Sequence, residues 1–209
     1  MTSTQGNLDM GGRLPVMECF YSIQGEGMHT GKAAYFIRLA GCDVGCHWCD
    51  VKESWDKEKH PLKEIEELVS GVKLSKAPIV VITGGEPTMY SLDELTKALK
   101  REGFAVHLET SGSYPITGKF DWVCVSPKKT KPPLKESLNI ADELKVVVYN
   151  KDDFNWAEKN AQETAEKCNL FLQPEWGKAN HVMHWITEYI KDNPQWRISL
   201  QTHKYLNIL

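Results

Sequence analysis

At 209 residues the chain is long enough for one sizeable core, and its composition, 41% hydrophobic and 25% charged, is that of an ordinary globular protein. The formal net charge is −3 and no basic block stands out, so direct binding to nucleic acid is not expected. The first fourteen residues are polar, and no apolar run approaches the roughly eighteen residues of a membrane span, so we expect a cytoplasmic protein without a signal peptide.

Apolar runs rich in β-branched and aromatic residues alternate with amphipathic stretches, which is the pattern of parallel strands joined by crossover helices in the α/β class. The runs expected to form strands are 34–40, 79–83, 105–109, 122–125, 144–149, 170–173 and 196–201. The stretches expected to form helices are 62–70, 92–101, 152–167 and 181–192. Residues 126–140 are rich in Lys and Pro and are expected to form a loop. We expect a flexible N-terminal segment, 1–15, and one core domain, 16–209.

Clusters of polar residues begin where the predicted strands end. They are Cys42 and the segments 84–87, 109–112, 126–128, 173–175 and 201–203. In β/α barrels the carboxyl ends of the strands form the rim at which active sites are built. With only about six or seven strands, the barrel is expected to be incomplete and open on one side, with its site at this rim.

Three cysteines, Cys42, Cys46 and Cys49, lie within eight residues, separated by gaps of three and two. Thiolates at this spacing can hold three irons of a [4Fe-4S] cube and leave the fourth iron free to bind a substrate or cofactor. The alternative is a zinc site with His47 as fourth ligand, although zinc favours paired ligands and His47 lies between two of the cysteines.

Disulfides are not expected, because the sequence shows no export signal and thiols stay reduced inside cells. The scattered cysteines are expected to be small apolar residues in or near the core: Cys19, Cys124 and Cys168.

Two glycine-containing turns carry further polar groups. Thr83 ends a buried run and is followed by Gly-Gly-Glu-Pro at 84–87, where glycines let the backbone approach a ligand closely. A simple strand-to-helix turn is the alternative. Segment 21–27 combines two glycines with Gln24 and Glu26. A carboxylate beside an amide can read the donor and acceptor edge of an amino-pyrimidinone ring, and a polar hairpin turn is the alternative.

Arg38 stands inside the apolar run 34–40, where a guanidinium needs an anion. A substrate carboxylate would supply that anion. The alternative is a structural ion pair with a carboxylate of the chain itself, from Glu18, Glu26 or Glu109.

The cysteine motif, with the aromatic Trp48 directly before its last cysteine, resembles the CxxxCxφC motif of radical S-adenosylmethionine (SAM) enzymes. A wider set of motifs, over about 16–209, closely resembles the 7-carboxy-7-deazaguanine synthase family. The segments that carry this resemblance are 22–27, 42–50, 83–87, 109–112, 125–128 and 196–209. The resemblance implies a modified, incomplete radical SAM (β/α) barrel with parallel strands, and a homodimer.

The activity implied by the resemblance is a lyase reaction in the biosynthesis of queuosine, a tRNA modification, and of other 7-deazapurines. It contracts the ring of 6-carboxy-5,6,7,8-tetrahydropterin to 7-carboxy-7-deazaguanine and releases ammonia. SAM is regenerated in each cycle and carries the radical, so no side chain is expected to be catalytic in the covalent sense, and the protein supplies orientation and a dry environment. An electron donor such as flavodoxin or ferredoxin is implied as a partner.

The resemblance also assigns ligands to matching positions. Cys42, Cys46 and Cys49 would hold the [4Fe-4S] cluster. The residues implied to contact SAM are Trp48, Cys49, Asp50, Gly85, Glu86, Ser126, Pro127, Lys128, Gln173, Pro174, Glu175 and Trp176. Those implied to contact the pterin are Ile23, Gln24, Gly25, Glu26, Arg38 and Thr83, together with His203 and Leu209 of the C-terminal segment.

Two assignments depend on features particular to this chain. The family uses Mg²⁺ held by the substrate and by a threonine after the Cys-Asp pair, but this chain has Val51 there, without an oxygen ligand. We therefore expect either weaker dependence on Mg²⁺ or a metal held by Asp50, the pterin carboxylate and water. The free carboxylate of Leu209 is expected to fold over the amine groups of the substrate, and a docked end that only completes the fold is the alternative.

Two rival functions share the cysteine motif. A radical SAM activase would generate a glycyl radical on a partner protein, but the turn at 24–26 and Arg38 suit a small heterocyclic acid better. A non-catalytic iron-sulfur electron-transfer or sensor protein is expected to have four cysteine ligands instead of three.

Overall fold

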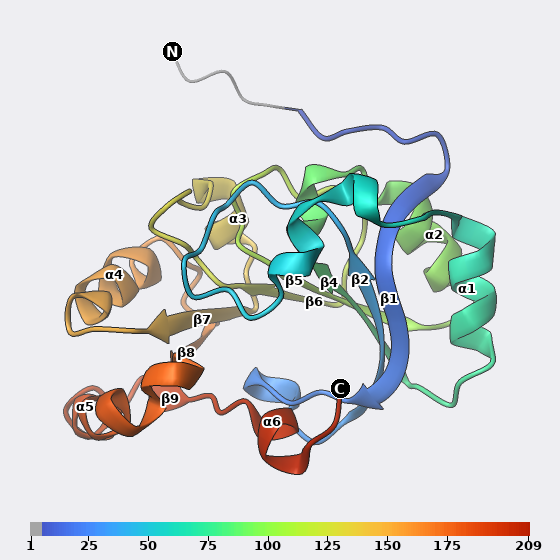
Figure 1. The fold of residues 1–209 in the computed structure, drawn as a ribbon. Helices are drawn as coiled ribbons and strands as arrows, with labels where there is room; N and C mark the ends of the chain where they lie inside the picture. The colour runs from blue at the N-terminus through green and yellow to red at the C-terminus, as the bar shows by residue number, and fades with distance from the viewer. Residues whose placement is uncertain (1–5) are drawn as a thin grey trace.

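A computed structural model describes residues 6–209, so the predicted N-terminal segment, 1–15, lies partly outside the described residues. Nine strands form one sheet in the order β3-β1-β2-β4-β5-β6-β7-β8-β9, curved around a central opening (Figure 1). The strands are β1 (Arg13–Ile23), β2 (Ala33–Leu39), β3 (Leu62–Glu64), β4 (Ile79–Gly84), β5 (Ala105–Thr110), β6 (Trp122–Val125), β7 (Glu143–Val148), β8 (Asn169–Pro174) and β9 (Trp196–Ile198).

Neighbouring strands from β2 to β9 are parallel, whereas β1 is antiparallel to both β2 and β3. Among the strands of residues 6–209, β3 and β9 end the order and do not pair with each other. The sheet is therefore an open barrel, and the expected α/β class with parallel strands is confirmed.

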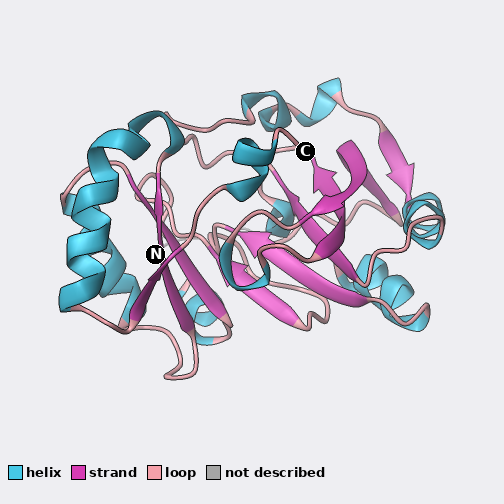
Figure 2. Cartoon of the chain, turned by 90° about the horizontal axis from the view of Figure 1, so that it is seen from below, coloured by secondary structure: helices cyan, strands magenta, loops and turns pink. Residues whose placement is uncertain are grey.

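Five helices pack on the outer side of the curved sheet (Figure 2): α1 (Ile65–Lys73), α2 (Asp93–Arg101), α3 (Lys135–Asn139), α4 (Asp152–Ala161) and α5 (Ala179–Asp192). The short helix α6 (Thr202–Leu206) lies instead at the cavity, which its residues His203 and Lys204 line. Short 3₁₀ turns complete the connections: η1 (Gly27–His29), η2 (Lys52–Trp55), η3 (Lys57–Lys59), η4 (Pro87–Met89) and η5 (Trp176–Lys178). No helix in the described part of the chain has the length and apolar character needed to cross a bilayer.

Alternation along each strand separates the core from the barrel interior, because successive side chains point to opposite faces of a sheet. On β7, Leu144 and Val146 belong to the main core under the helices, whereas Lys145 faces the interior. On β2, Ile37 and Leu39 likewise belong to that core, and interior positions of several strands carry polar side chains. The parallel strands thus bring polar groups that are distant in sequence to one concave surface.

Several predicted element boundaries were wrong. Strand β1 was not predicted, because Pro15 and a register shift between Val16 and Glu18 disturb its alternation. The helix predicted at 62–70 begins only at Ile65, since Leu62–Glu64 pairs with β1 as strand β3.

Three further differences concern loops and ends. The helix predicted at 152–167 ends at Ala161, where bonds from the backbone of residues 163 and 164 to carbonyls three residues earlier tighten the chain into turns. The strand predicted at 196–201 ends at Ile198. The predicted loop 126–140 contains the short helix α3, in which Leu138 is buried against the core.

Candidate active site

A cavity of about 720 Å³ opens at the carboxyl ends of the parallel strands. It is lined by every residue predicted to hold the cluster, SAM or the pterin except Pro127, which is buried with its carbonyl accepting a hydrogen bond from Trp156 at 3.4 Å. These lining residues come from the turn after β1, from β2 and β4, from the loops after β2, β4, β6 and β8, and from the C-terminal segment. Tertiary structure therefore brings the separate motifs together at one site.

The cysteine loop is attached to its neighbours through backbone hydrogen bonds. The Gly41 and Cys42 amides donate to the carbonyls of Ser54 and Trp55, at 2.6 and 3.1 Å. The Gly41 carbonyl in turn accepts from the Glu86 amide at 2.8 Å, which joins the Gly-Gly-Glu-Pro turn to the start of the loop. These bonds place the cysteine loop at one wall of the cavity, hereafter the cysteine wall (residues 41–50 and 84–87).

The three thiols of this wall, on Cys42, Cys46 and Cys49, are free and half-buried at the cavity surface. Burial raises the pKa of the Cys42 thiol to about 11, and burial also raises the pKa of Cys46, where the Lys128 ammonium opposes it. Within residues 6–209, no three His, Cys, Asp or Glu side chains converge closely enough to hold a single metal ion. A three-thiol donor set beside an open cavity fits an iron-sulfur cube, in which each thiolate binds a different iron.

Glu86 serves the fold more than the cavity. Its carboxylate is 1% exposed and accepts hydrogen bonds from the amide and hydroxyl of Thr88, from the Thr110 hydroxyl and from the amide and hydroxyl of Ser111. The side chain therefore ties the turn after β4 to the end of β5. Only its backbone remains suited to the predicted contact with SAM.

Cationic and aromatic side chains surround the predicted SAM contacts. The Lys128 ammonium donates to the Ser126 carbonyl and hydroxyl at 2.5 and 2.7 Å and lies 5.6 Å from the Trp48 ring centroid. Burial lowers the pKa of Lys128. Lys204 of α6 contacts the Asp50 carboxylate at 2.5 Å and lies 5.2 Å from the Trp176 ring centroid. The C-terminal helix thereby reaches the residue next to Cys49.

Arg38 lines the cavity, but its Nε donates to the Glu18 carboxylate at 2.7 Å. The side chain of Arg38 is 21% exposed, so the ion pair lies at the cavity surface. The expected structural ion pair of Arg38 is thus present in the fold, and binding of a substrate carboxylate by the same guanidinium stays a prediction.

Leu209 also lines the cavity, and its carbonyl accepts a hydrogen bond from the Ser22 hydroxyl at 2.6 Å.

The wall opposite the cysteines is held by side chains. Gln24 donates to the Glu109 carboxylate at 2.8 Å, and Gln201 donates to Glu26 at 2.9 Å. The backbone amide of Glu26 donates to Gln24 Oε1 at 3.1 Å. Together with Lys145, these four side chains form what we call the ionic wall.

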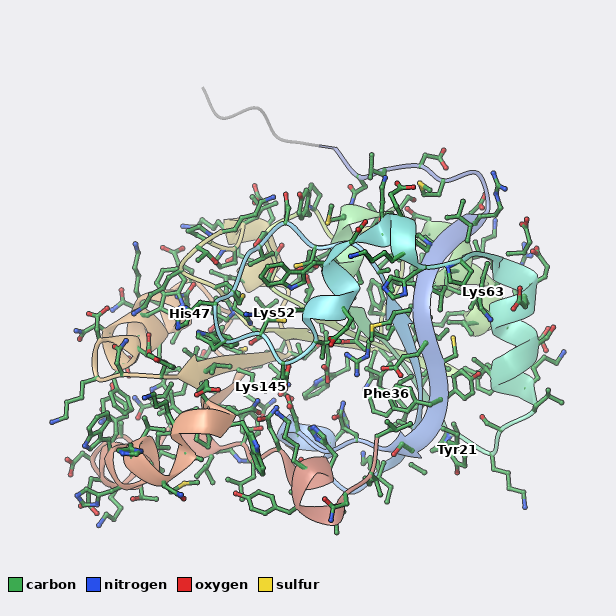
Figure 3. The ribbon with its side chains drawn as sticks, viewed as in Figure 1. Tyr21, Phe36, His47, Lys52, Lys63 and Lys145 are labelled. Carbon is green, nitrogen blue, oxygen red and sulfur yellow. The ribbon has the colours of Figure 1, made fainter. Side chains whose placement is uncertain are left out.

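Lys145 was missed by the sequence analysis, although a lone lysine within the apolar strand 144–149 is the signal that marks it. Its ammonium contacts the Glu26 carboxylate at 2.5 Å and the Glu109 carboxylate at 4.0 Å, and its side chain is only 5% exposed. Figure 3 labels Lys145 near the middle of the molecule, between the cysteine loop and α6, whereas Lys63 lies at the outer edge beside α1. Burial alone would raise the pKa of Glu26, but the charge and hydrogen bond of Lys145, with the hydrogen bond of Gln201, lower it to about 2.

Comparisons with known proteins agree with this geometry. Residues 36–144 match the Radical SAM superfamily. A 7-carboxy-7-deazaguanine synthase of Flavobacterium psychrophilum is 54% identical over 96% of this chain and 95% of its own, and one of Synechocystis is 48% identical over 93% of both chains. The crystal structure of QueE from Escherichia coli superposes with a TM-score of 0.82 at 32% identity, covering 90% of this chain and 93% of that one.

Proposed function

The chain belongs to the 7-carboxy-7-deazaguanine synthases of the radical SAM superfamily, and from this membership we infer that it is a lyase of 7-deazapurine (queuosine) biosynthesis. Its reaction is the ring contraction of 6-carboxy-5,6,7,8-tetrahydropterin to 7-carboxy-7-deazaguanine with release of ammonia. The observation that carries this function is the single cavity in which three thiols and a Gly-Gly-Glu-Pro turn face a wall of carboxylates and amides. The core domain that performs it is proposed to be 16–209.

The donor set suits the cofactors of the superfamily. Cys42, Cys46 and Cys49 would hold a [4Fe-4S] cluster, and SAM would lie against the loops after β4, β6 and β8. When bound, these groups supply the one-electron chemistry that removes a hydrogen atom from the substrate and returns it. We propose that the SAM contacts are those predicted from the resemblance, with Glu86 contributing through its backbone.

The chain's own residues would orient the pterin and exclude water. Glu26 and Gln24 offer acceptors and a donor to the amino-pyrimidinone edge, and Arg38 offers a cation to the carboxylate. His203 and Leu209 line the same cavity from the C-terminal segment. The Thr202 amide and hydroxyl both bond the Gly25 carbonyl, at 2.9 and 2.8 Å, so this segment is attached to the substrate turn and covers it.

The dependence on Mg²⁺ is proposed to be weak, because Val51 lines the cavity where the family offers a threonine oxygen. Chelator-treated enzyme titrated with MgCl₂ is expected to gain less than about tenfold in rate, equivalent to about 1.4 kcal/mol. Val51→Thr serves as the matched variant and should gain more. A tenfold or larger stimulation of the unmodified protein would instead favour a metal held by Asp50, the pterin carboxylate and water.

Partners and location follow from the resemblance. We propose a cytoplasmic homodimer that receives its electron from a flavodoxin or ferredoxin. Exposed apolar side chains near the C-terminus, Tyr205, Leu206 and Ile208, offer surface that a second copy can cover. Light scattering of the purified protein tests the dimer directly.

Product analysis tests the function. Anaerobically purified protein should be brown and, with SAM, a reductant and 6-carboxy-5,6,7,8-tetrahydropterin, should release ammonia and 7-carboxy-7-deazaguanine. A Cys49→Ala variant is the control and should form no product. Cleavage of SAM with no conversion of the pterin would point to the activase function, and an iron-sulfur protein unable to cleave SAM would point to electron transfer.

A further inference from the structure

One buried cation of the barrel interior has no role in the function described above. Lys145 lies on β7, and its side chain is 5% exposed at the inner end of the cavity. A buried ammonium is costly unless carboxylates and hydrogen-bond acceptors surround it. The groups around Lys145 therefore indicate which function this residue has.

Carboxylates surround Lys145 from three parts of the sheet. Glu26 follows β1, Glu109 is on β5 and Glu143 is on β7 itself, and the Cys124 thiol of β6 also lies near the ammonium. Further out, Lys128 faces the same interior after β6, and His203 of α6 faces Glu26. Lys145 is the cation that directly contacts the two cavity carboxylates, Glu26 and Glu109.

Glu143 has a different position from the other two carboxylates. It accepts hydrogen bonds from the Met28 amide at 3.0 Å, from the Trp122 indole at 3.3 Å and from the Cys124 thiol at 3.4 Å. Of these donors only Cys124 lines the cavity, whereas Met28, Trp122 and Glu143 itself do not. Glu143 is thus satisfied without Lys145, whereas Glu26 and Glu109 face the space that the pterin would occupy.

We propose that Lys145 is a positioning residue of the ring contraction, which holds the Glu26 carboxylate, with Glu109 near it, in the orientation that accepts the N–H groups of the pterin's amino-pyrimidinone ring. One oxygen of Glu26 faces Lys145 and the other faces Gln201, so the plane of this carboxylate is determined before substrate binds. Gln24 orients Glu109 in the same way. The inference rests on the proposed function, since it names the group that prepares the same site.

Without the ammonium, the Glu26 carboxylate would lose the cation that opposes the effect of burial, so the pKa of Glu26 would rise and its protonated form would become populated. A protonated carboxyl loses acceptor capacity toward a ring N–H. The substrate would then bind weakly and in the wrong orientation, so SAM would be cleaved without ring contraction. The expected signature is a raised KM that falls again as the pH rises and the Glu26 carboxylate regains its charge.

The test compares Lys145→Met with the wild-type holoenzyme. The variant should raise KM for 6-carboxy-5,6,7,8-tetrahydropterin at least tenfold and kcat less, and the ratio of 5′-deoxyadenosine to product should increase. Its KM should decrease from pH 6 to pH 8, whereas that of the wild type stays flat. Lys145→Arg, which keeps the charge, should recover part of the affinity.

Because a buried charge is removed, Lys145→Met alone could reduce folding. Lys145→Met/Glu143→Gln keeps the net charge of the cluster and should recover the melting temperature while KM remains high, and Glu143→Gln alone should leave KM unchanged. A well-folded double variant with the wild-type KM and a flat pH profile would overturn the proposal. Failure of the wild type to convert the pterin would instead refute the proposed function.

Discussion

The two walls of the cavity are held by different kinds of interaction. The cysteine wall is attached through backbone hydrogen bonds among Gly41, Ser54 and Glu86. The ionic wall depends on side chains, above all on the contact of Lys145 with Glu26. Backbone hydrogen bonds do not change with the protonation of side chains, whereas a carboxylate loses acceptor capacity when it is protonated. The proposed cofactor side of the site thus has a fixed geometry, and the proposed substrate side is suited to electrostatic recognition.

The largest effect is expected from a methyl group added to the cysteine wall. Gly84 has a φ of +145°, and a Cβ there would lie 2.1 Å from the Leu39 carbonyl oxygen, so the backbone must move. We expect Gly84→Ala to cost more than about 3 kcal/mol, from strain and steric overlap together, and to prevent cluster incorporation. The measurements are melting temperature and iron content per chain.

Gly45, in the cysteine loop itself, provides the matched control. Its φ is +71°, but a Cβ there would meet nothing within 4 Å. Gly45→Ala should therefore cost only the left-handed strain of about 1–2 kcal/mol and retain the cluster. Equal losses in the two variants would show that backbone contact is not what holds this wall.

A smaller, pH-dependent effect is expected from the ionic wall. Because the pKa of Glu26 is lowered to about 2 from an ordinary value of 4.5, its ionised form stabilises the fold above about pH 4.5, and this stabilisation is lost as the pH falls toward 2. Glu26→Gln should be less stable than the wild type at pH 7, and the difference should shrink in acid. Urea unfolding from pH 7 to acid measures this difference in the free energy of unfolding. A difference that does not change with pH would contradict stabilisation by the ionised Glu26.

Side chains also attach the cysteine wall, and Asp43 is one of them. Asp43, between the first two cysteines, accepts hydrogen bonds from the Tyr114 hydroxyl at 2.5 Å and from Lys131 at 2.7 Å. Since Asp43 is half-exposed, Asp43→Asn should cost about 1 kcal/mol and speed the loss of iron to a chelator severalfold. Asp192→Asn, on α5, is the control. An unchanged rate of iron loss would show that the Asp43 side chain does not hold the loop.

The smallest effect is expected where the two walls meet. The Lys204–Asp50 pair joins α6 to the cysteine loop, but the Asp50 side chain is 56% exposed. Lys204→Met should lower stability by only about 0.5 kcal/mol, and the difference should vanish at high salt. Chemical denaturation at low and high ionic strength measures this. A larger loss that persists in salt would mean that α6 is held by packing of the lysine stem, and not by charge.

The alternation of apolar runs with amphipathic stretches was sufficient to predict the parallel strands, and nearly all residues predicted from the motifs line one cavity. The cysteine loop and the Gly-Gly-Glu-Pro turn are local features, because the spacing of the cysteines and the backbone freedom of the glycines depend on consecutive residues. Strand β1 was not predictable from periodicity, since its bulge and Pro15 interrupt the alternation and its partners, β2 and β3, are distant in sequence. The role of Glu86 was also hidden, because its hydrogen-bond donors Thr110 and Ser111 lie on another strand.

Local sequence therefore determined the cysteine motif, the glycine turns and the α/β pattern, each of which depends on residues close together in the chain. Tertiary structure decided the charge state and orientation of the groups in the ionic wall. Lys145 and Glu26 are 119 positions apart and meet only because β7 and the turn after β1 reach the same barrel interior. Burial and Coulomb energy depend on distances in space, which the sequence does not give, so the ionic wall could be identified only in the folded structure.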